Sequence, residues 1–213
     1  MKSPALKINL LLIITAFAYT VSLYSGLPSR LPTHWNFQGQ IDGYSPKFPF
    51  AFLLPCLMLL MVVAFCIFPQ IDPQKNKYRL FQREWHLIQV GLVSFFLLLH
   101  IVTLAAATNP AIRVDTIVPI GIGLLYIFMG NYFGKIRQNW FLGIRTPWTL
   151  SNQQVWNKTH RFAGYTFVLS GFLILLLSLL TAPSILFLVI LLAGAFLPVL
   201  YSYLVYRRIS HDR

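Results

Sequence analysis

The chain is poor in acidic residues. Only 5 of its 213 residues are Asp or Glu, and charged residues of both signs make up 10% of the sequence. A soluble domain carries about 25% charged residues, whereas 57% of this chain is hydrophobic. The five carboxylates lie in loops and tails and form no close pair of the kind that acid–base catalysis needs. We therefore expect an integral membrane protein and no enzymatic activity.

Cysteines and cofactor-binding motifs are also scarce. The two cysteines, Cys56 and Cys66, lie on one predicted helix, about 15 Å apart along its axis, which is too far for a disulfide bond. The sequence contains no Gly-rich phosphate loop, nucleophile elbow or metal-ligand spacing. His86 and His160 would lack a third ligand if they met at a metal. We expect no cofactor, no metal site and no catalytic residue.

Long runs without charge predict the fold. A bilayer core of about 30 Å needs roughly 20 apolar residues of helix, and the charge-free runs of the chain are long enough for six such helices. Pro183 divides the last run in two, because proline ends one helix and fits the first turn of the next. We predict an all-α polytopic membrane protein with six transmembrane helices, near residues 7–25, 48–68, 86–107, 115–133, 162–181 and 184–206.

The basic residues predict the orientation. Lys and Arg resist translocation, and with a cytoplasmic N-terminus all of the 17 except Arg30, Lys47 and Arg113 fall on the inner side. Both termini are then cytoplasmic. Residues 1–213 would form a single integral-membrane domain, with an extracellular cap loop at 26–47 and a cytoplasmic motif loop at 134–161. Topology and anionic lipid explain the net charge of +12, so we expect no direct contact with nucleic acid.

The cap loop combines turn residues with aromatic residues in "GLPSRLPTHWNFQGQIDGYSPKF", residues 26–48. Its prolines and its Asp-Gly pair favour a compact hairpin. Two interpretations of its aromatic residues, Trp35, Phe37 and Tyr44, stay open. They form either an aromatic belt at the membrane interface or a rigid recognition surface, to which His34, Asn36 and Asp42 add polar groups.

The motif loop contains basic and aromatic residues but no carboxylate in "NWFLGIRTPWTLSNQQVWNKTHRFAG", residues 139–164. Ser151 and Gln154 have the spacing of a capping box, so we expect a helix to start at Asn152 and to continue into the fifth span. Before it, Arg145-Thr146-Pro147-Trp148 is expected to form an extended elbow, because the residue before a proline avoids helical angles.

The predicted helix carries one stripe of side chains at helical spacing, formed by Trp156, Thr159, His160, Ala163 and Phe167. This stripe is either a packing face or, together with the elbow, a docking platform. In the second interpretation Arg145 clamps a carboxylate or phosphate through its planar guanidinium, and Trp148 anchors the partner. An acidic protein and a lipid headgroup suit such a surface equally well.

Both loops resemble known signatures. The outer "PTHWNFQGQIDGY" is similar to the P-x-H-W-x-x-x-G-x-x-D signature of an uncharacterised bacterial membrane domain, and the inner "NWFLGIRTPWTL" with "VWNKTHRFAG" resembles the signature of SdpI-type immunity proteins. The resemblance implies a multispan plasma-membrane protein of Gram-positive bacteria that protects its producer from a secreted toxic peptide. It also implies signalling, in which the toxin-loaded protein captures a small winged-helix repressor at the membrane.

The resemblance and the loop patterns together give candidate residues on both faces. The candidates for extracellular toxin recognition are Pro32, His34, Trp35, Asn36, Gly39 and Asp42. The candidates for cytoplasmic docking of a partner are Asn139, Gly143, Arg145, Thr146, Pro147, Trp148, Trp156, His160 and Arg161. The expected partners are a secreted toxic peptide outside, a winged-helix repressor inside, and membrane lipid.

Two other functional classes stay open. A small-solute or proton-coupled transporter places ionisable groups inside the bilayer, and the candidate within a span is His100, with Asn131 as a polar companion. A lone histidine in a helix bundle more often hydrogen-bonds a neighbouring helix. The other class is a structural membrane protein whose inner loop binds anionic lipid alone.

Signalling across the membrane needs a helix packing with two states that both loops bias. The fourth helix is the candidate moving part. Pro119, Gly121 and Gly123 loosen its outer half, and Gly130-x-x-x-Gly134 lets another helix approach closely at its inner end.

Overall fold

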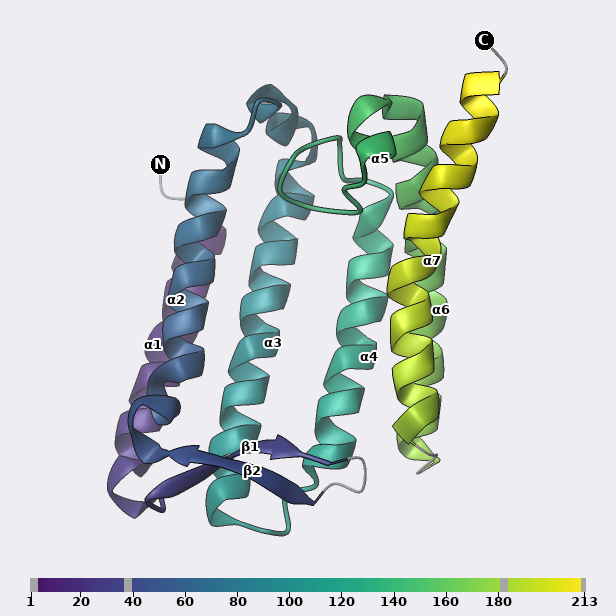
Figure 1. Cartoon of the computed structure of the whole chain (residues 1–213). Helices are drawn as coiled ribbons and strands as arrows, with labels where there is room; N and C mark the ends of the chain where they lie inside the picture. The colour runs from purple at the N-terminus through teal and green to yellow at the C-terminus, as the bar shows by residue number, and fades with distance from the viewer. Residues whose placement is uncertain (1–3, 37–39, 181–183, 212–213) are drawn as a thin grey trace. The chain divides into compact units, whose positions relative to one another are not determined.

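The computed structural model describes residues 4–36, 40–180 and 184–211, and within them six helices are long and apolar enough to cross a membrane (Figure 1). About 80% of the structure is helical, which confirms the all-α polytopic class. The elements are, in chain order, α1 (Pro4–Leu23), η1 (Tyr24–Gly26), β1 (Arg30–Trp35), β2 (Ile41–Pro46), α2 (Lys47–Ile71), η2 (Lys75–Phe81), α3 (Gln82–Thr108), α4 (Val114–Phe133), α5 (Pro147–Ser151), α6 (Gln153–Leu179) and α7 (Ser184–His211).

Several helices extend beyond their predicted limits. α2 continues to Ile71 instead of residue 68, α3 begins at Gln82 instead of residue 86, and α7 continues to His211 instead of residue 206. The predicted limits followed hydropathy, whereas the helical backbone continues into flanking residues that include Gln and Arg, which are good helix formers. The predicted divider, Thr181 to Pro183, lies outside the described residues.

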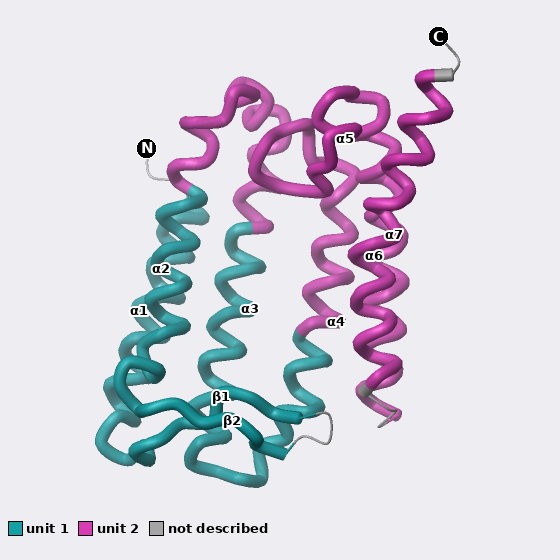
Figure 2. Tube along the Cα trace, in the orientation of Figure 1, with its two compact units in different colours: residues 1–65, 89–121 teal, residues 66–88, 122–213 magenta. Residues whose placement is uncertain are grey.

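The chain groups into two compact units, each built from separate stretches of sequence (Figure 2). Unit 1 comprises residues 1–65 and 89–121, and unit 2 comprises residues 66–88 and 122–213. Unit 1 therefore contains α1 and the β-hairpin, and unit 2 contains the loop after α4 together with α5, α6 and α7.

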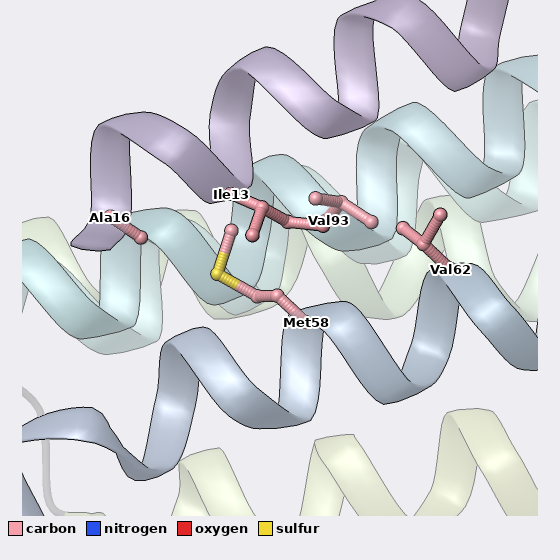
Figure 3. Packing of buried hydrophobic residues seen from close by; sticks show 5 residues of the cluster. All are labelled: Ile13, Ala16, Met58, Val62 and Val93. Carbon is pink, nitrogen blue, oxygen red and sulfur yellow. The ribbon is translucent and has the colours of Figure 1, made fainter. Parts of the chain in front are cut away.

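The core of unit 1 is a small apolar cluster where α1, α2 and α3 meet (Figure 3). Its members are Ile13, Ala16, Met58, Val62 and Val93, none more than 4% exposed. By contrast, Ile14 and Leu60 on the same helices are 64% and 63% exposed. Apolar side chains exposed on the outside of a helix are suited to contact with lipid. The backbone needs no partner there, because its N–H and C=O groups are paired within the helix.

A buried histidine links α1 to α3 within unit 1. The Nε2 atom of His100 lies 2.8 Å from the Thr20 hydroxyl and 3.2 Å from the Ala16 carbonyl oxygen. In α4, Asn131 donates from Nδ2 to Ile127 O of its own helix at 2.7 Å. Both polar side chains that a transporter would use are thus engaged in helix hydrogen bonds, which favours the packing interpretation of His100.

The cap loop, residues 26–47, folds into the compact hairpin that its turn residues predict. β1 and β2 pair antiparallel, with Arg30 opposite Pro46 and Trp35 opposite Ile41, and the register is irregular around His34. The hairpin is anchored by Leu31, which is fully buried in a cluster with Leu27, Ala51 and Leu104. One edge of the hairpin therefore packs against the ends of α2 and α3.

In unit 2, α4 and α6 approach through two pairs of glycines. A methyl group added to Gly171 would lie 2.6 Å from Gly123 O, and one added to Gly130 would lie 2.8 Å from Gly164 O. The partners on each helix are seven residues apart, so both contacts fall on one face. The close approach expected at Gly130-x-x-x-Gly134 is therefore found at Gly130 but not at Gly134, which lies beyond the end of α4 and where a methyl group would meet nothing closer than 3.9 Å.

α6 and α7 run side by side in the same unit (Figure 1). Phe162 stacks on Tyr201 with ring centroids 4.3 Å apart. A methyl group added to Gly194 of α7 would lie 2.6 Å from Ser170 Oγ of α6. The two helices therefore also approach closely at Gly194, because glycine has no side chain. This pair of helices supports the loop that contains the inner motif.

Candidate functional site

The loop between α4 and α5 is folded around the side chain of Asn139, which is fully buried. Its Oδ1 accepts hydrogen bonds from the backbone N–H groups of Phe141 and Leu142 at 2.9 and 2.7 Å. Its Nδ2 donates to the carbonyl oxygens of Arg137 and Leu142 at 2.9 and 3.1 Å. One amide side chain thus satisfies four backbone groups, which holds residues 137–142 in a tight turn.

His160 holds the next part of the loop against α6. Its Nδ1 lies 2.9 Å from Trp156 O, and because a carbonyl oxygen only accepts, Nδ1 carries the proton. Its Nε2 is then free to accept from Ile144 N at 3.0 Å. The imidazole is therefore neutral and acts as a spacer between the helix and the loop.

Gly143 permits this contact. Its φ is +110°, and a methyl group added there would lie 2.2 Å from His160 Nε2. Only glycine combines that backbone conformation with so close an approach. The contact with His160, which lies 17 positions later in the sequence, therefore requires a glycine at position 143.

Trp156 completes the buried side of the site. Its ring stacks on His160 with centroids 3.9 Å apart, and its Nε1 donates to Ile136 O at 2.9 Å. Thr159 and Ala163 on the same stripe are also fully buried. The stripe on α6 is thus a packing face in this structure, which was one of its two interpretations.

The elbow around Pro147 differs from the expected extended segment. Thr146 is extended, with φ −102° and ψ 162°, as a residue before proline should be. Pro147 and Trp148, however, begin the short helix α5, which Thr146 caps through a capping box with Thr149. The expectation failed because proline is equally suited to the first position of a helix.

The predicted capping box at the start of the next helix is also wrong. Asn152, one residue after Ser151, is the N-cap of α6, and its Oδ1 accepts from Gln154 N and Val155 N at 2.8 and 3.2 Å. Ser151 instead ends α5 and donates to Trp148 O at 3.2 Å. Asparagine is as good an N-cap as serine, so the sequence pattern did not distinguish the two.

A buried carboxylate pairs with this loop. Asp72, which follows α2 and is 2% exposed, accepts from Trp140 N at 2.9 Å and from the Tyr78 hydroxyl at 2.9 Å, both through Oδ2. Its Oδ1 accepts from Gln74 N at 2.6 Å. Three donors satisfy the carboxylate without any ion pair, which is how a buried charge is retained at low cost.

A second polar link runs parallel to the first. Gln138 Oε1 accepts from Lys77 Nζ at 3.0 Å, and Gln138 Nε2 donates to the carbonyl oxygens of Thr149 and Leu150, both at 2.9 Å. Phe141 stacks on Phe68 of α2 with centroids 4.3 Å apart. The α2–α3 connection and the motif loop therefore form one ordered layer.

The exposed surface of this layer is small and basic. Arg145 is exposed and donates from Nη1 to Trp140 O at 2.8 Å. Trp140 is 49% exposed, and Pro147 is exposed beside them in sequence. Trp148 lies against Tyr203 of α7, with centroids 5.1 Å apart, and is half-buried.

The nine candidates for partner docking therefore divide into two kinds. Those that are buried and hold the loop are Asn139, Thr146, Trp156 and His160. Those that are exposed are Arg145, Pro147 and Arg161. Gly143 and Trp148 are intermediate, and Arg161 lines a separate cavity between α6 and α7. Direct contact with a partner is available to the exposed kind only.

The outer candidates come together on the hairpin. His34 Nδ1 lies 2.5 Å from Asp42 Oδ1, and both side chains are exposed. Asn36 closes the loop by accepting from Gln40 N at 2.9 Å. Pro32 is buried, Trp35 is half-buried, and Gly39 lies outside the described residues. The described hairpin thus presents a hydrogen-bonded His–Asp pair and a half-exposed tryptophan.

Sequence reasoning missed Asp72, Tyr78, Gln138 and Trp140 as parts of the site. Trp140 lies inside the inner motif and its exposure was not foreseen. Asp72 had a usable signal, since it is one of only 5 acidic residues in the chain and lies in a loop assigned to the same side as the motif. Tyr78 and Gln138 have no signal that separates them from other polar loop residues.

Two models of known protein families match the parts of the chain that contain the hairpin and the motif loop. A model described as the SdpI/YfhL protein family matches residues 135–202, and a domain of unknown function (DUF1648) matches residues 11–59. "Immunity protein SdpI" of Bacillus subtilis (strain 168) is 29% identical over 209 residues, which cover 97% of this chain and 98% of that protein. No solved structure matches the chain. The chain is a multi-pass plasma-membrane protein of a Gram-positive bacterium, and over nearly its whole length it is similar to the SdpI-type immunity proteins.

Proposed function

We propose that the protein is an immunity protein that protects the cell producing it from a secreted toxic peptide. The observation that carries this proposal is the similarity to an immunity protein over nearly the whole of both chains. The similarity includes the hairpin as well as the motif loop, so the two regions proposed to act are both within it.

The hairpin is the proposed toxin-recognition surface. Its backbone is held by strand pairing and by the buried Leu31, so Trp35 and the His34–Asp42 pair are presented on a rigid support. Rigid aromatic side chains lose little conformational entropy on binding and often dominate interface energies. A peptide with an apolar and a charged element fits such a surface.

The exposed part of the motif loop is the proposed docking surface for a winged-helix repressor. Arg145 donates a hydrogen bond to the carbonyl oxygen of Trp140, and the backbone N–H of Trp140 donates to the buried carboxylate of Asp72. Arg and Trp side chains are both enriched at the centres of protein interfaces. The basic, carboxylate-free character of the loop favours a partner with acidic side chains.

α2 offers a physical link between recognition and docking. The helix begins directly after β2 and ends directly before Asp72, whose carboxylate holds Trp140 N. A small displacement of α2 when the toxin binds would move Asp72 and change the position of Trp140. Signalling of this kind needs two discrete packings of α2, each favoured by one ligand state.

The proposal is tested by expressing the chain in a sensitive host and challenging it with candidate toxic peptides. Trp35→Ala should abolish protection, whereas Tyr44→Ala, on an exposed residue of the same hairpin, should retain it. Equal loss in both variants would assign the aromatic residues to a membrane belt. If no candidate peptide discriminates the expressing host from the empty host, the immunity role is rejected.

Signalling is tested separately with a transcriptional reporter. Arg145→Ala should remove the response while protection stays, and Arg137→Ala, an exposed arginine of the same loop, should leave both intact. Arg145→Lys keeps the charge but loses the planar fork that binds a carboxylate through two hydrogen bonds. A normal response in Arg145→Lys would indicate that the loop contacts anionic lipid and not a protein.

A further inference from the structure

A cavity of about 510 Å³ lies between the first turns of α6 and the part of α7 around Tyr201. It has two basic side chains, two amides and three aromatic rings in its lining: Lys158 and Arg161, Gln154 and Asn157, and Phe162, Tyr165 and Tyr201. The α6 members recur at three- or four-residue spacing, so they share the helix face opposite the buried Trp156 stripe. Arg161 is the one docking candidate among these lining residues, and the docking surface proposed above, which consists of Arg145 and Trp140, uses none of them.

The two cations of the cavity are not neutralised by the part of the chain that the structure describes. Lys158 and Arg161 are exposed and lie three residues apart. The ion pairs among the described residues join His34 to Asp42 and Arg113 to Asp115, and no acidic residue lines the cavity. Two adjacent cations in a recess create a site for an anion.

The position of the cavity along α6 identifies the kind of anion. Arg161 is the last charged residue before a charge-free run that continues to Tyr206. Directly after it, α6 directs Tyr165, Leu169 and Phe172 outward, and these are 69%, 62% and 58% exposed. The cavity therefore lies at the boundary between a polar surface and a lipid-facing apolar surface, which is the depth of phospholipid headgroups.

We infer that this cavity binds the phosphate group of an anionic phospholipid. Arg161 matches phosphate geometry with its planar donors and Lys158 adds a second positive charge. Gln154 and Asn157 offer hydrogen bonds to headgroup hydroxyls, while the acyl chains lie along Leu169 and Phe172. Basic recesses between membrane helices are known to hold anionic headgroups in this way.

A phospholipid accounts for the surroundings better than other anions do. Free phosphate would use the cations but not the exposed hydrocarbon below them. An acidic protein segment would have to enter the interface beside Tyr165 and Leu169, where its own backbone would lose hydrogen bonds to water. The inference concerns neither toxin nor repressor, so it stands or falls independently of the proposed function.

The test is lipid binding to the purified full chain in detergent, measured by native mass spectrometry with phosphatidylglycerol and phosphatidylcholine. Phosphatidylglycerol should bind preferentially to the unmodified chain. In Lys158→Gln/Arg161→Gln it should bind about thirtyfold more weakly. Each cation near an anionic membrane surface increases the affinity about fivefold, and the variant lacks two of them. Phosphatidylcholine binding should change little.

The matched control is Arg79→Gln/Arg83→Gln, which removes the same charge from exposed residues outside the cavity. Its affinity for phosphatidylglycerol should stay within about twofold of the unmodified chain. Equal weakening in both double variants would show that binding follows net charge, and the inference would be rejected. Thermal unfolding of each variant checks that the fold is intact. If Lys158→Gln/Arg161→Gln does not fold, Arg161→Lys is measured in its place, and it should retain most of the phosphatidylglycerol binding.

Two further arms separate the sources of the anion. Soluble glycerol phosphate should compete with phosphatidylglycerol only weakly, and competition at equal concentration would overturn the inference in favour of a free phosphate site. A poly-glutamate peptide should bind equally to the unmodified chain and to the double variant. Loss of peptide binding in the double variant, without preference for phosphatidylglycerol, would assign the cavity to an acidic protein.

Discussion

At the scale of single residues, Gly143 gives the sharpest test of the motif loop. Gly143→Ala requires an alanine at φ +110° and places its methyl group 2.2 Å from His160 Nε2. The strain of such a conformation costs about 1–3 kcal/mol, and the Ile144 N to His160 hydrogen bond must break. We expect faster proteolysis and faster hydrogen exchange of residues 137–146.

Gly134→Ala is the matched control for that variant. Gly134 lies in the same connection between α4 and α5, and an added methyl group would be 3.9 Å from the nearest atom, which is an ordinary contact. Its hydrogen exchange should match that of the unmodified chain. If Gly143→Ala exchanges no faster than Gly134→Ala, His160 does not hold the loop as described.

Asp72→Asn tests the buried carboxylate. The carboxylate accepts from Gln74 N, Trp140 N and the Tyr78 hydroxyl, and an amide offers only one oxygen. Its NH₂ group must therefore face at least one of these donors. An unsatisfied buried donor costs about 1–3 kcal/mol, so the unfolding midpoint in detergent should fall.

Asp115→Asn supplies the comparison for Asp72→Asn. Asp115 pairs with Arg113 at 2.9 Å, but both side chains are exposed, and exposed ion pairs contribute about 0–1 kcal/mol. The two substitutions are chemically identical, but one removes a buried carboxylate with three hydrogen-bond donors and the other an exposed carboxylate with an arginine partner. Equal shifts of the unfolding midpoint would contradict the role assigned to Asp72.

The residue scale also shows how far the sequence could predict the site. The burial of Trp156, Thr159 and His160 follows from local helical spacing, which a sequence displays directly. The contact of Asp72 with Trp140 spans 68 positions, and nothing in either segment specifies the other. Turn chemistry was ambiguous for a further reason, since Ser151 and Asn152 are both good N-caps and Pro147 suits both an elbow and a first helical turn.

At the scale of elements, the glycine contacts determine how closely α4 and α6 pack in unit 2. Gly130→Val would direct two methyl groups toward Gly164 O and Val168, where even one methyl group would meet atoms at 2.7–2.8 Å. Overpacking of this kind costs about 1–3 kcal/mol, and the helices must separate. We expect a lower unfolding midpoint and new accessibility of Gly164→Cys to a thiol reagent.

Gly26→Val is the control for the glycine contacts. An added methyl group at Gly26 would meet nothing within 4 Å, so the valine variant should unfold within about 0.5 kcal/mol of the unmodified chain. Should Gly130→Val unfold at the same midpoint as Gly26→Val, the close approach of α4 to α6 would be wrong. The test also bears on signalling, because a fixed α4–α6 pair would have to move as one body.

Element positions were predictable from hydropathy, but element contacts were not. Five charge-free runs, the last of them divided at Pro183, correspond to six helices, since a bilayer demands helices of that length and composition. From the sequence, Gly121 and Gly123 were expected to loosen the helix, and only the spacing of Gly130 and Gly134 predicted a close approach. The structure uses Gly123 and Gly130, because the partner glycines on α6 are seven residues apart and not four.

At the scale of the whole molecule, the proposed division of labour depends on orientation, with the hairpin outside and the motif loop inside. The excess of Lys and Arg in the segments assigned to the cytoplasm is the physical basis of this orientation. Cysteine labelling tests it directly. Both native cysteines, which are exposed on α2, are first replaced in Cys56→Ala/Cys66→Ala, and single cysteines are then added at exposed sites.

In intact cells, a membrane-impermeant maleimide should label Gln40→Cys in the hairpin and Ala111→Cys in the α3–α4 connection. Ser151→Cys, at the end of α5, should react only after permeabilisation. These three residues are exposed in the structure, so a lack of labelling reports sidedness and not burial. Labelling of Ser151→Cys in intact cells would place the Arg145 surface outside, where a cytoplasmic repressor could never reach it, and toxin recognition would then have to be assigned to both loops together.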